Sequence, residues 1–182
     1  MTRLLALVAA AAAIAATAAG AGAAPAPAAS LVAPATVCPE RGLSAPAAAQ
    51  QVQMLCLVNY ARQQVGEAPL EETAPLDESA ADKALDIVRC DSFSHYACGR
   101  EFTYWMRANG YLERCWHVGE NLAYGVGRLG SALAIFRAWL RSPTHRANLL
   151  GDYAQTGLSL RVGRLEGSPG VHVWAQHFGS RC

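Results

Sequence analysis

All six cysteines of this 182-residue chain follow an apolar N-terminal segment; they are Cys38, Cys56, Cys90, Cys98, Cys115 and Cys182. That segment has a positive charge at Arg3, an Ala- and Leu-rich run over 4–19 and small residues at 21–23. This pattern is typical of a secretory signal peptide, predicted here over 1–23. A membrane anchor is the alternative, but the run is shorter than the roughly 20 residues that span a bilayer. In an exported chain an even number of cysteines predicts disulfides, with Cys90 and Cys98 as the most local candidate pair.

The rest of the chain reads as one neutral domain behind a short leader. Residues 24–46 are rich in Ala and Pro and predict a weakly ordered, semi-extended lead-in. Residues 47–182 are long enough for one domain with its own core. Once Arg3 is removed, 14 basic residues face 14 acidic ones, without a basic stripe. The sequence therefore argues against nucleic-acid binding, predicts no membrane span after cleavage of the signal, and favours a monomer.

Hydrophobic periodicity predicts helices followed by a short hairpin. Helical spacing of apolar residues indicates helices over 47–65, 75–89, 101–108 and 131–141, and a short helical turn over 144–150. Two extended runs, 156–162 and 171–178, are joined by a Gly- and Pro-containing link and predict an antiparallel hairpin. The segment 116–124 fits either a strand edge or an irregular loop. Helices ahead of a small antiparallel sheet indicate an α+β fold.

Three polar motifs carry the candidate functional groups His95, Glu120 and His145, and each of these residues lies 25 positions after the one before it. A neutral imidazole binds divalent metals, and a carboxylate adds charge or activates a water molecule. If the fold brings the three together, they would form a binding cluster in which His95 and His145 hold Zn²⁺ or another divalent metal. Each also has a plainer interpretation: a hydrogen-bonded loop histidine, a carboxylate that accepts backbone N–H groups, and a histidine that stabilises a short helix.

Other polar residues leave alternatives open. Asn59 and Arg62 lie near the apolar stripe of the first helix, where they either face solvent or bind backbone carbonyls of a neighbouring loop. Ser94 is adjacent to His95, but neither a Gly-x-Ser-x-Gly elbow nor a His-Glu-x-x-His helix is present. His177, in the last strand, is expected at the surface or in packing, and a place at the site is the less favoured alternative.

The order of these motifs resembles that of the CAP superfamily. This is the SCP-like group of cysteine-rich secretory, antigen 5 and pathogenesis-related-1 proteins, here in its bacterial form. The likeness covers about residues 50–180 and rests on Asn59-x-x-Arg62, Pro69-Leu70, Phe93-Ser94-His95, Gly110-Tyr111, Gly119-Glu120-Asn121-Leu122-Ala123, Trp139-Leu140-x-Ser142-Pro143-x-His145-Arg146-x-Asn148-Leu149-Leu150 and Trp174-Ala175-Gln176-x-Phe178-Gly179. Each motif alone is weak, whereas their combination is specific.

The resemblance implies a three-layer α-β-α sandwich with a small antiparallel sheet and a cavity lined by two histidines and two glutamates. His95 matches the first family histidine, Glu120 matches the glutamate of the Gly-Glu-Asn motif, and His145 matches the histidine of the bacterial branch. The second family glutamate has no counterpart, because Arg141-Ser142 stands there, and the second family histidine has none, because Val173 stands at its position. The residues assigned to bracing the site are Asn59, Arg62, Asn121, Arg146 and Asn148.

Family activities are varied, so several functions are weighed. We expect a secreted binding module for a small hydrophobic ligand or a cell-envelope component. One alternative is a metal-assisted hydrolase of peptides or cell-wall material, with Glu120 as general base to a bound water. The other is a purely structural domain in which the polar cluster only braces loops. The binding module is favoured over the enzyme.

Overall fold

The computed structural model describes residues 27–112 and 116–181. The signal peptide predicted over 1–23, Cys115 and Cys182 lie outside the described residues. The helices are α1 (Ala47–Gln64), α2 (Ala74–Arg89), α3 (Thr103–Ala108), α4 (Ala132–Arg141) and α5 (Pro143–Leu149), with 3₁₀ turns η1 (Ala28–Leu31), η2 (Ala97–Gly99) and η3 (Gly127–Gly130). The strands are β1 (Glu71–Glu72), β2 (Trp116–Val126), β3 (Gln155–Leu165) and β4 (Ser168–Arg181). Within the described part of the chain, no helix has the length and apolar character needed to cross a bilayer.

One four-stranded sheet organises the molecule, in the order β1-β3-β4-β2. The predicted hairpin forms its centre, since β3 and β4 pair in antiparallel fashion. Strand β2 pairs antiparallel with β4 and places Glu120 opposite His177, so the ambiguous segment around 116–124 is a strand. The two-residue β1 pairs in parallel with β3 and makes the sheet mixed, a feature that the sequence did not indicate.

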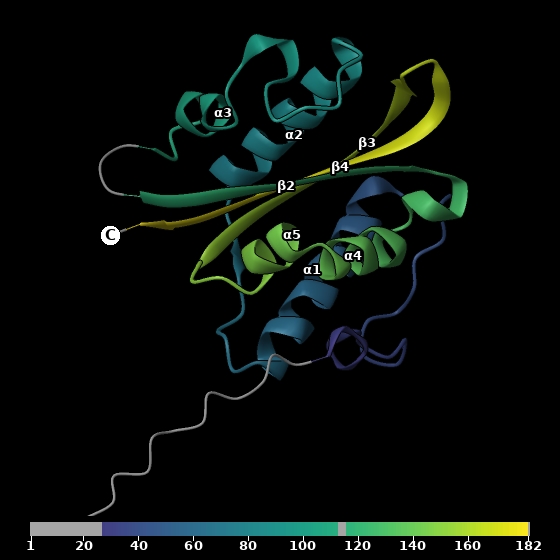
Figure 1. The fold of residues 1–182 in the computed structure, drawn as a ribbon, viewed down its shortest axis with the longest axis vertical. Coiled ribbons are helices and arrows are strands. Elements are labelled where there is room, and N and C mark those ends of the chain that lie inside the picture. Colours follow the sequence, from purple (N-terminus) through teal and green to yellow (C-terminus); the bar gives the residue numbers. More distant parts are fainter. Residues whose placement is uncertain (1–26, 113–115, 182) are drawn as a thin grey trace, which may run out of the picture.

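Helices cover both faces of this sheet, so the predicted α+β sandwich is confirmed. Figure 1 shows α2 and α3 on one face and α1, α4 and α5 on the other. Side chains of β4 alternate between the two cores: Trp174 and Phe178 pack with α1 and α4, whereas Val173 and Ala175 pack with α2. Strand β4 is therefore buried on both faces, and any polar side chain on it needs an internal partner.

The segment before α1 belongs to the packed structure. Leu31, Ala33 and Cys38 are buried in the core cluster on the α1 side. A disulfide joins Cys38 to Cys56 of α1. This differs from the weakly ordered lead-in expected over 24–46, because three small or apolar side chains and one covalent bond hold part of that segment against the domain.

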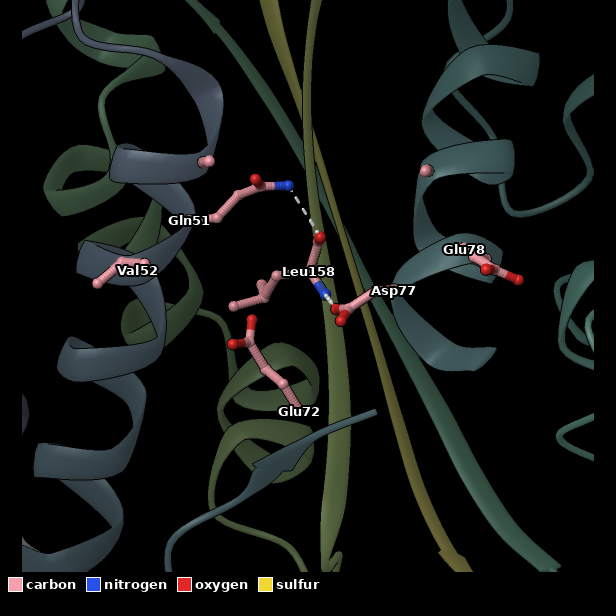
Figure 2. Close-up of a pocket in the computed structure, with 8 residues that line it drawn as sticks. Gln51, Val52, Glu72, Asp77, Glu78 and Leu158 are labelled. Carbon is pink, nitrogen blue, oxygen red and sulfur yellow. Dashed lines mark hydrogen bonds between the residues drawn. The ribbon is translucent and has the colours of Figure 1, made fainter. Parts of the chain in front are cut away.

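Helix α2 lies unusually close to the sheet at its first turn. A Cβ on Gly157 of β3 would overlap the backbone of Leu76 and Asp77. Asp77 Oδ1 accepts the Leu158 N–H at 3.0 Å, and Gln51 Nε2 of α1 donates to the Leu158 carbonyl at 2.9 Å, so both helices bind the main chain of the same residue (Figure 2). This close approach brings the buried side of α2 near the side chains of β4.

Candidate functional site

Glu120 of β2 is the centre of a buried polar cluster. Its Oε1 lies 2.6 Å from His95 Nδ1, and its Oε2 lies 2.9 Å from His177 Nε2. An ionised carboxylate only accepts hydrogen bonds, so each ring donates an N–H to it. Because the Nδ1 of His95 donates to Glu120, its Nε2 keeps a free lone pair whenever the ring is neutral. Glu120 thus fixes the tautomers of two histidines.

The chain of hydrogen bonds continues inward from His177 to α2. Ser79 Oγ lies 2.7 Å from His177 Nδ1 and donates to it when the ring is neutral, since the other ring nitrogen then carries the proton. Ser79 and His177 are both fully buried, whereas the His95 side chain is 52% exposed. The connectivity Ser79–His177–Glu120 resembles a hydrolase triad, but a serine without access to solvent cannot reach a substrate. Ser79 and His177 instead support His95 from inside the protein, through the carboxylate of Glu120.

A buried lysine adds positive charge below the same carboxylate. Lys83 of α2 donates from Nζ to the His95 carbonyl at 2.6 Å and lies 3.9 Å from Glu120 Oε2. Burial lowers the pKa of Lys83, and the charges of Glu120 and Asp86 oppose that shift. Burial alone would raise the pKa of Glu120, but hydrogen bonds from His177 and His95, with the charges of His177 and Lys83, bring the pKa below its ordinary value. Glu120 is therefore ionised at neutral pH.

His145 approaches from the other side of the edge strand β2. It lies in α5, its Nδ1 is 2.8 Å from Ser142 Oγ, and its main-chain carbonyl accepts a hydrogen bond from Asn121 Nδ2 at 3.1 Å. Burial lowers the pKa of His145, and the nearby charge of His95 lowers it further. His145 is therefore neutral at pH 7. The structure joins His95 to Glu120 directly and brings His145 to the same end of β2.

Two asparagines hold α5 against the edge strand. Asn148 Nδ2 donates to the Glu120 carbonyl at 3.2 Å and to Asn121 Oδ1 at 2.9 Å. Since Asn121 in turn donates to His145, the amides connect both main-chain and side-chain groups around the cluster. They provide the partners that an edge strand otherwise lacks. Arg146, assigned with them as a brace, lies in α5 and lines a hollow on the side of α4 and α5.

Asn59 and Arg62 bind backbone groups of neighbouring loops and do not face solvent. Asn59 exchanges hydrogen bonds with Leu70, donating to its carbonyl at 3.1 Å and accepting its N–H at 2.8 Å. The buried guanidinium of Arg62 donates to four carbonyls; these belong to Ala68, Leu149, Gly151 and Tyr153. Arg62 therefore joins α1 to the turn that follows α5.

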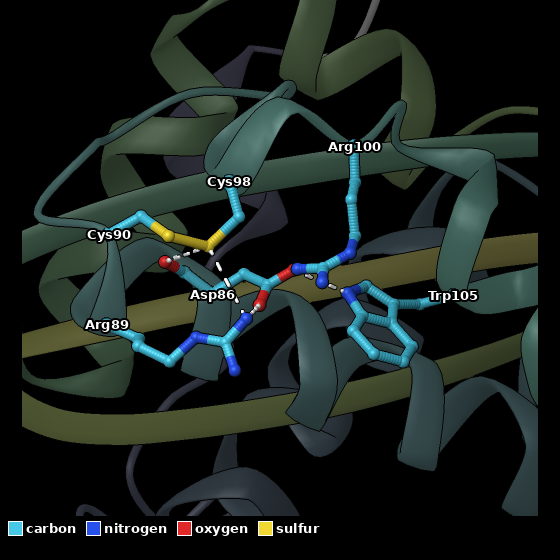
Figure 3. The surroundings of a disulfide bond; sticks show 6 residues. All are labelled: Asp86, Arg89, Cys90, Cys98, Arg100 and Trp105. Atoms are coloured by element: carbon cyan, nitrogen blue, oxygen red, sulfur yellow. Dashed lines mark hydrogen bonds and ion pairs between the residues drawn. A yellow bond between two sulfur atoms is a disulfide. The ribbon is translucent and has the colours of Figure 1, made fainter.

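A disulfide closes the loop that carries His95. Cys90 ends α2, and Cys98 bonds to it across the loop, in line with the local pair suggested by the sequence. Next to this bond, the buried carboxylate of Asp86 accepts hydrogen bonds from Arg100 Nη1 and Trp105 Nε1, both at 2.8 Å (Figure 3). The covalent bond and the carboxylate hold both ends of the His95 loop against α2.

The residues that sequence reasoning missed are Ser79, Lys83 and His177. His177 was expected at the surface or in packing, but it is buried and bonded to Glu120. Its role follows from the register of β2 and β4, in which Glu120 and His177 are direct partners. That register is not visible in the sequence while 116–124 is ambiguous. Ser79 and Lys83 lie on the buried side of α2. Polar residues at buried positions need internal hydrogen-bond partners, and this signal was present in the sequence.

His95 and His145 are the candidate metal ligands of this cluster. Among the described residues no group of three His, Cys, Asp or Glu side chains is arranged to hold a metal ion. Glu120 has both oxygens bound to imidazoles, and Lys83 places a cation nearby. The Nε2 atoms of His95 and His145 have no hydrogen-bond partner among these residues. A ligating histidine that donates its other N–H to a carboxylate is a common arrangement, which His95 meets.

Comparisons with known proteins agree on the fold. The chain's fold is similar to a Bacillus anthracis extracellular protein containing a SCP domain (TM-score 0.61, 19% identity, covering 74% of this chain and 41% of that one). It is also similar to an outer surface protein from Borrelia burgdorferi (TM-score 0.58, 19% identity, covering 71% of this chain and 90% of that one). A third similar fold is that of a cysteine-rich secretory protein from Staphylococcus aureus (TM-score 0.58, 16% identity, covering 76% of this chain and 40% of that one). The chain thus spans less than half the length of the first and third of these proteins.

The sequence itself identifies the family. No curated protein sequence matches the chain. The model of the cysteine-rich secretory protein family, CAP, matches residues 55–178, which include His95, Glu120, His145 and His177. The matched region runs from α1 to the end of the sheet core and makes up more than half of the chain, so this protein belongs to the CAP family.

Proposed function

We propose that the domain is a secreted binding module in which a divalent ion contacts His95 and His145 at the β2 edge and a small hydrophobic ligand lies in a separate hollow beside α5. The observation that carries the proposal is the saturation of Glu120: both of its oxygens are bound by imidazoles, and the carboxylate is buried. The groups left to meet a ligand are the half-exposed ring of His95 and the partly exposed ring of His145. Secretion is supported by the signal-peptide pattern and by the extracellular or outer-surface descriptions of two neighbours.

The same observation weighs against the hydrolase alternative. A general base needs a free oxygen within hydrogen-bond reach of a water molecule. A water acting on Glu120 would have to displace His95 or His177, and Lys83 stabilises the ionised, fully bonded state. The geometry therefore supports binding through the imidazoles better than proton transfer to the carboxylate.

A divalent metal bridging His95 and His145 is part of the proposal, and Zn²⁺ alone is the probe. Calorimetric titration is expected to show one bound ion, with affinity at least about tenfold weaker after His95→Ala or His145→Ala, because each removes one of two protein ligands. His117→Ala is the matched control, since His117 is an exposed histidine stacked on Tyr153 outside the cluster. Circular dichroism checks that each variant is folded.

Two outcomes would contradict the metal. Negligible heat with the wild-type protein would remove it, and so would an equal loss in all three variants, which indicates surface imidazoles binding independently. If His95→Ala lowers thermal stability and changes no binding signal for any probe, the purely structural alternative replaces the binding module.

A small hydrophobic ligand has a candidate place beside this cluster. A hollow of about 480 Å³ is lined by Leu140, Arg141, Pro143, Arg146, Ala147 and Leu150, so apolar side chains lie next to two guanidinium groups. This combination suits an acyl chain with an acidic head, because the chain is desolvated while the carboxylate meets positive charge. We place the lipid ligand of the module here, on the side of α5 away from His145.

Filling this hollow tests the lipid directly. Ala147→Trp is expected to abolish binding of palmitate, measured by displacement of a fluorescent fatty acid, because the indole occupies the space of the acyl chain. Ala81→Trp is the control, since Ala81 lines a different hollow of similar size between α1 and α2. Palmitate binding that survives Ala147→Trp unchanged would place the lipid elsewhere.

A further inference from the structure

We propose that a second hollow, remote from the His95–His145 cluster, is a binding site for a phosphate group. Its volume is about 250 Å³. It lies where the segment before α1, the 3₁₀ turn η3 and the first turns of α4 meet, and it is lined by Glu40, Arg41, Gln53, Arg128, Ser131, Leu133, Ala134 and Arg137. The proposal does not depend on the function assigned to the His95–His145 cluster.

Three arginine side chains line this hollow without forming an ion pair within the described part of the chain. Arg41, Arg128 and Arg137 come from three separate segments of the chain. Within residues 27–112 and 116–181, none of the three side chains has a hydrogen bond, an ion pair or a ring contact. Glu40 also lines the hollow, yet it forms no ion pair with any of them. In a chain whose acidic and basic residues nearly balance, this is a local excess of positive charge.

The floor of the hollow adds an oriented donor. Gln53 of α1 is buried, with 4% of its surface exposed. Its Oε1 accepts the Arg41 N–H at 2.9 Å, which fixes the carboxamide so that Nε2 carries the free N–H groups. No acceptor for Nε2 exists among the described residues. Gln53 lines the hollow, so an anion bound there can accept a hydrogen bond from this amide.

The start of α4 strengthens the preference for an anion. Ser131 Oγ accepts the Ala134 N–H at 3.3 Å and donates to the Arg128 carbonyl at 2.9 Å. The hydroxyl thereby uses its one O–H, and it joins the Arg128 segment to the helix start. The positive end of the helix dipole lies at the hollow, next to the three arginines.

The donor set and the size together select a phosphate group. Arginine presents paired N–H groups that match the oxygens of phosphate, and three arginines can surround a tetrahedral dianion from several directions. The volume falls below the roughly 300–1,000 Å³ of pockets that enclose whole drug-sized ligands, so the site would hold a head group and leave the rest of the ligand outside. Val126 and Leu129 are highly exposed on either side of Arg128, where they could contact a lipid that carries the phosphate.

Calorimetry with inorganic phosphate and with glycerol phosphate tests the site on the mature protein. Binding is expected to weaken about tenfold or more with Arg41→Gln, Arg128→Gln or Arg137→Gln, since each removes a charge-assisted hydrogen bond. The triple variant should not bind. Arg107→Gln is the control, because Arg107 is an exposed arginine of α3 on the opposite side of the sheet. The proposal is overturned if phosphate does not bind above chloride of equal ionic strength, or if Arg107→Gln weakens binding as much as the others.

Vesicles distinguish a lipid phosphate from a soluble ester. Mixed phosphatidylglycerol and phosphatidylcholine vesicles are compared with pure phosphatidylcholine in a flotation assay. If the phosphate belongs to a lipid, only the mixed vesicles bind, and Leu129→Ser weakens vesicle binding while soluble phosphate binds as before. If the phosphate belongs to a soluble ester, glycerol phosphate binds and the vesicles do not. Retention of phosphatidylglycerol binding by the triple arginine variant would overturn the site in either form.

Discussion

Replacing Arg62 by methionine is expected to lower the free energy of unfolding by about 4 kcal/mol. The guanidinium is 1% exposed and donates to carbonyls of Ala68, Leu149, Gly151 and Tyr153. Methionine keeps the length of the side chain but leaves these acceptors without donors. A buried acceptor without a partner costs on the order of 1–3 kcal/mol, and partial access of water to the loops limits the sum. Urea denaturation followed by circular dichroism measures the change.

The control separates the buried contacts from the loss of charge. Arg107→Met makes the same substitution at an exposed position of α3 and should change stability by no more than about 0.5 kcal/mol. Arg62→Lys should recover only part of the loss, because one ammonium group cannot reach acceptors in two separate loops. A loss below about 1 kcal/mol for Arg62→Met would show that the loops find other partners and that Arg62 does not hold them.

Removing the carboxylate of Glu120 is the second large effect. Glu120→Ala is expected to destabilise the fold by about 3–5 kcal/mol, the range for breaking a buried charge pair by deleting one partner. The substitution leaves Lys83 as a buried cation with a weaker counter-charge, and it takes from His177 the acceptor of its Nε2–H. Lys83→Met in the Glu120→Ala background should restore part of the stability. An additive double variant would show that the two charges do not interact.

The same carboxylate makes stability depend on pH in a defined direction. The pKa of folded Glu120 is below its ordinary value, so the folded state binds fewer protons there than the unfolded state. Its stabilisation is fully present above the unfolded pKa of about 4.3 and is lost as the pH falls through the lower folded value. Melting temperatures at a series of pH values below about 5 should fall more steeply for the wild type than for Glu120→Gln. Parallel curves would contradict this role.

Local sequence patterns were sufficient for most of the fold. The helices over 47–64 and 74–89 and the terminal hairpin follow from apolar spacing and from the Gly- and Pro-containing link, because both depend on neighbouring residues only. The parallel pairing of Glu71 and Glu72 with β3 has no such signal. It involves a two-residue strand and a partner more than 80 positions away, so only tertiary packing determines it.

The candidate site was predictable only in part, for the same physical reason. His95, Glu120 and His145 were visible as motifs, and their order indicated the family. The contact between Glu120 and His177 depends on the register of two strands 57 residues apart, and the role of Ser79 depends on how closely α2 approaches the sheet at Gly157. A sequence pattern shows which face a residue is on, but it does not show which partner lies across from it.

The bond between Cys90 and Cys98 makes recognition of the proposed ligand depend on whether these two cysteines are oxidised. While both thiols are reduced, the segment bearing His95 samples many backbone conformations, and a ligand would have to select the one in which the ring meets Glu120. Oxidation removes that freedom before any ligand arrives. Protein with both thiols reduced should therefore recognise the proposed ligand poorly, and full affinity should develop only once the disulfide has formed.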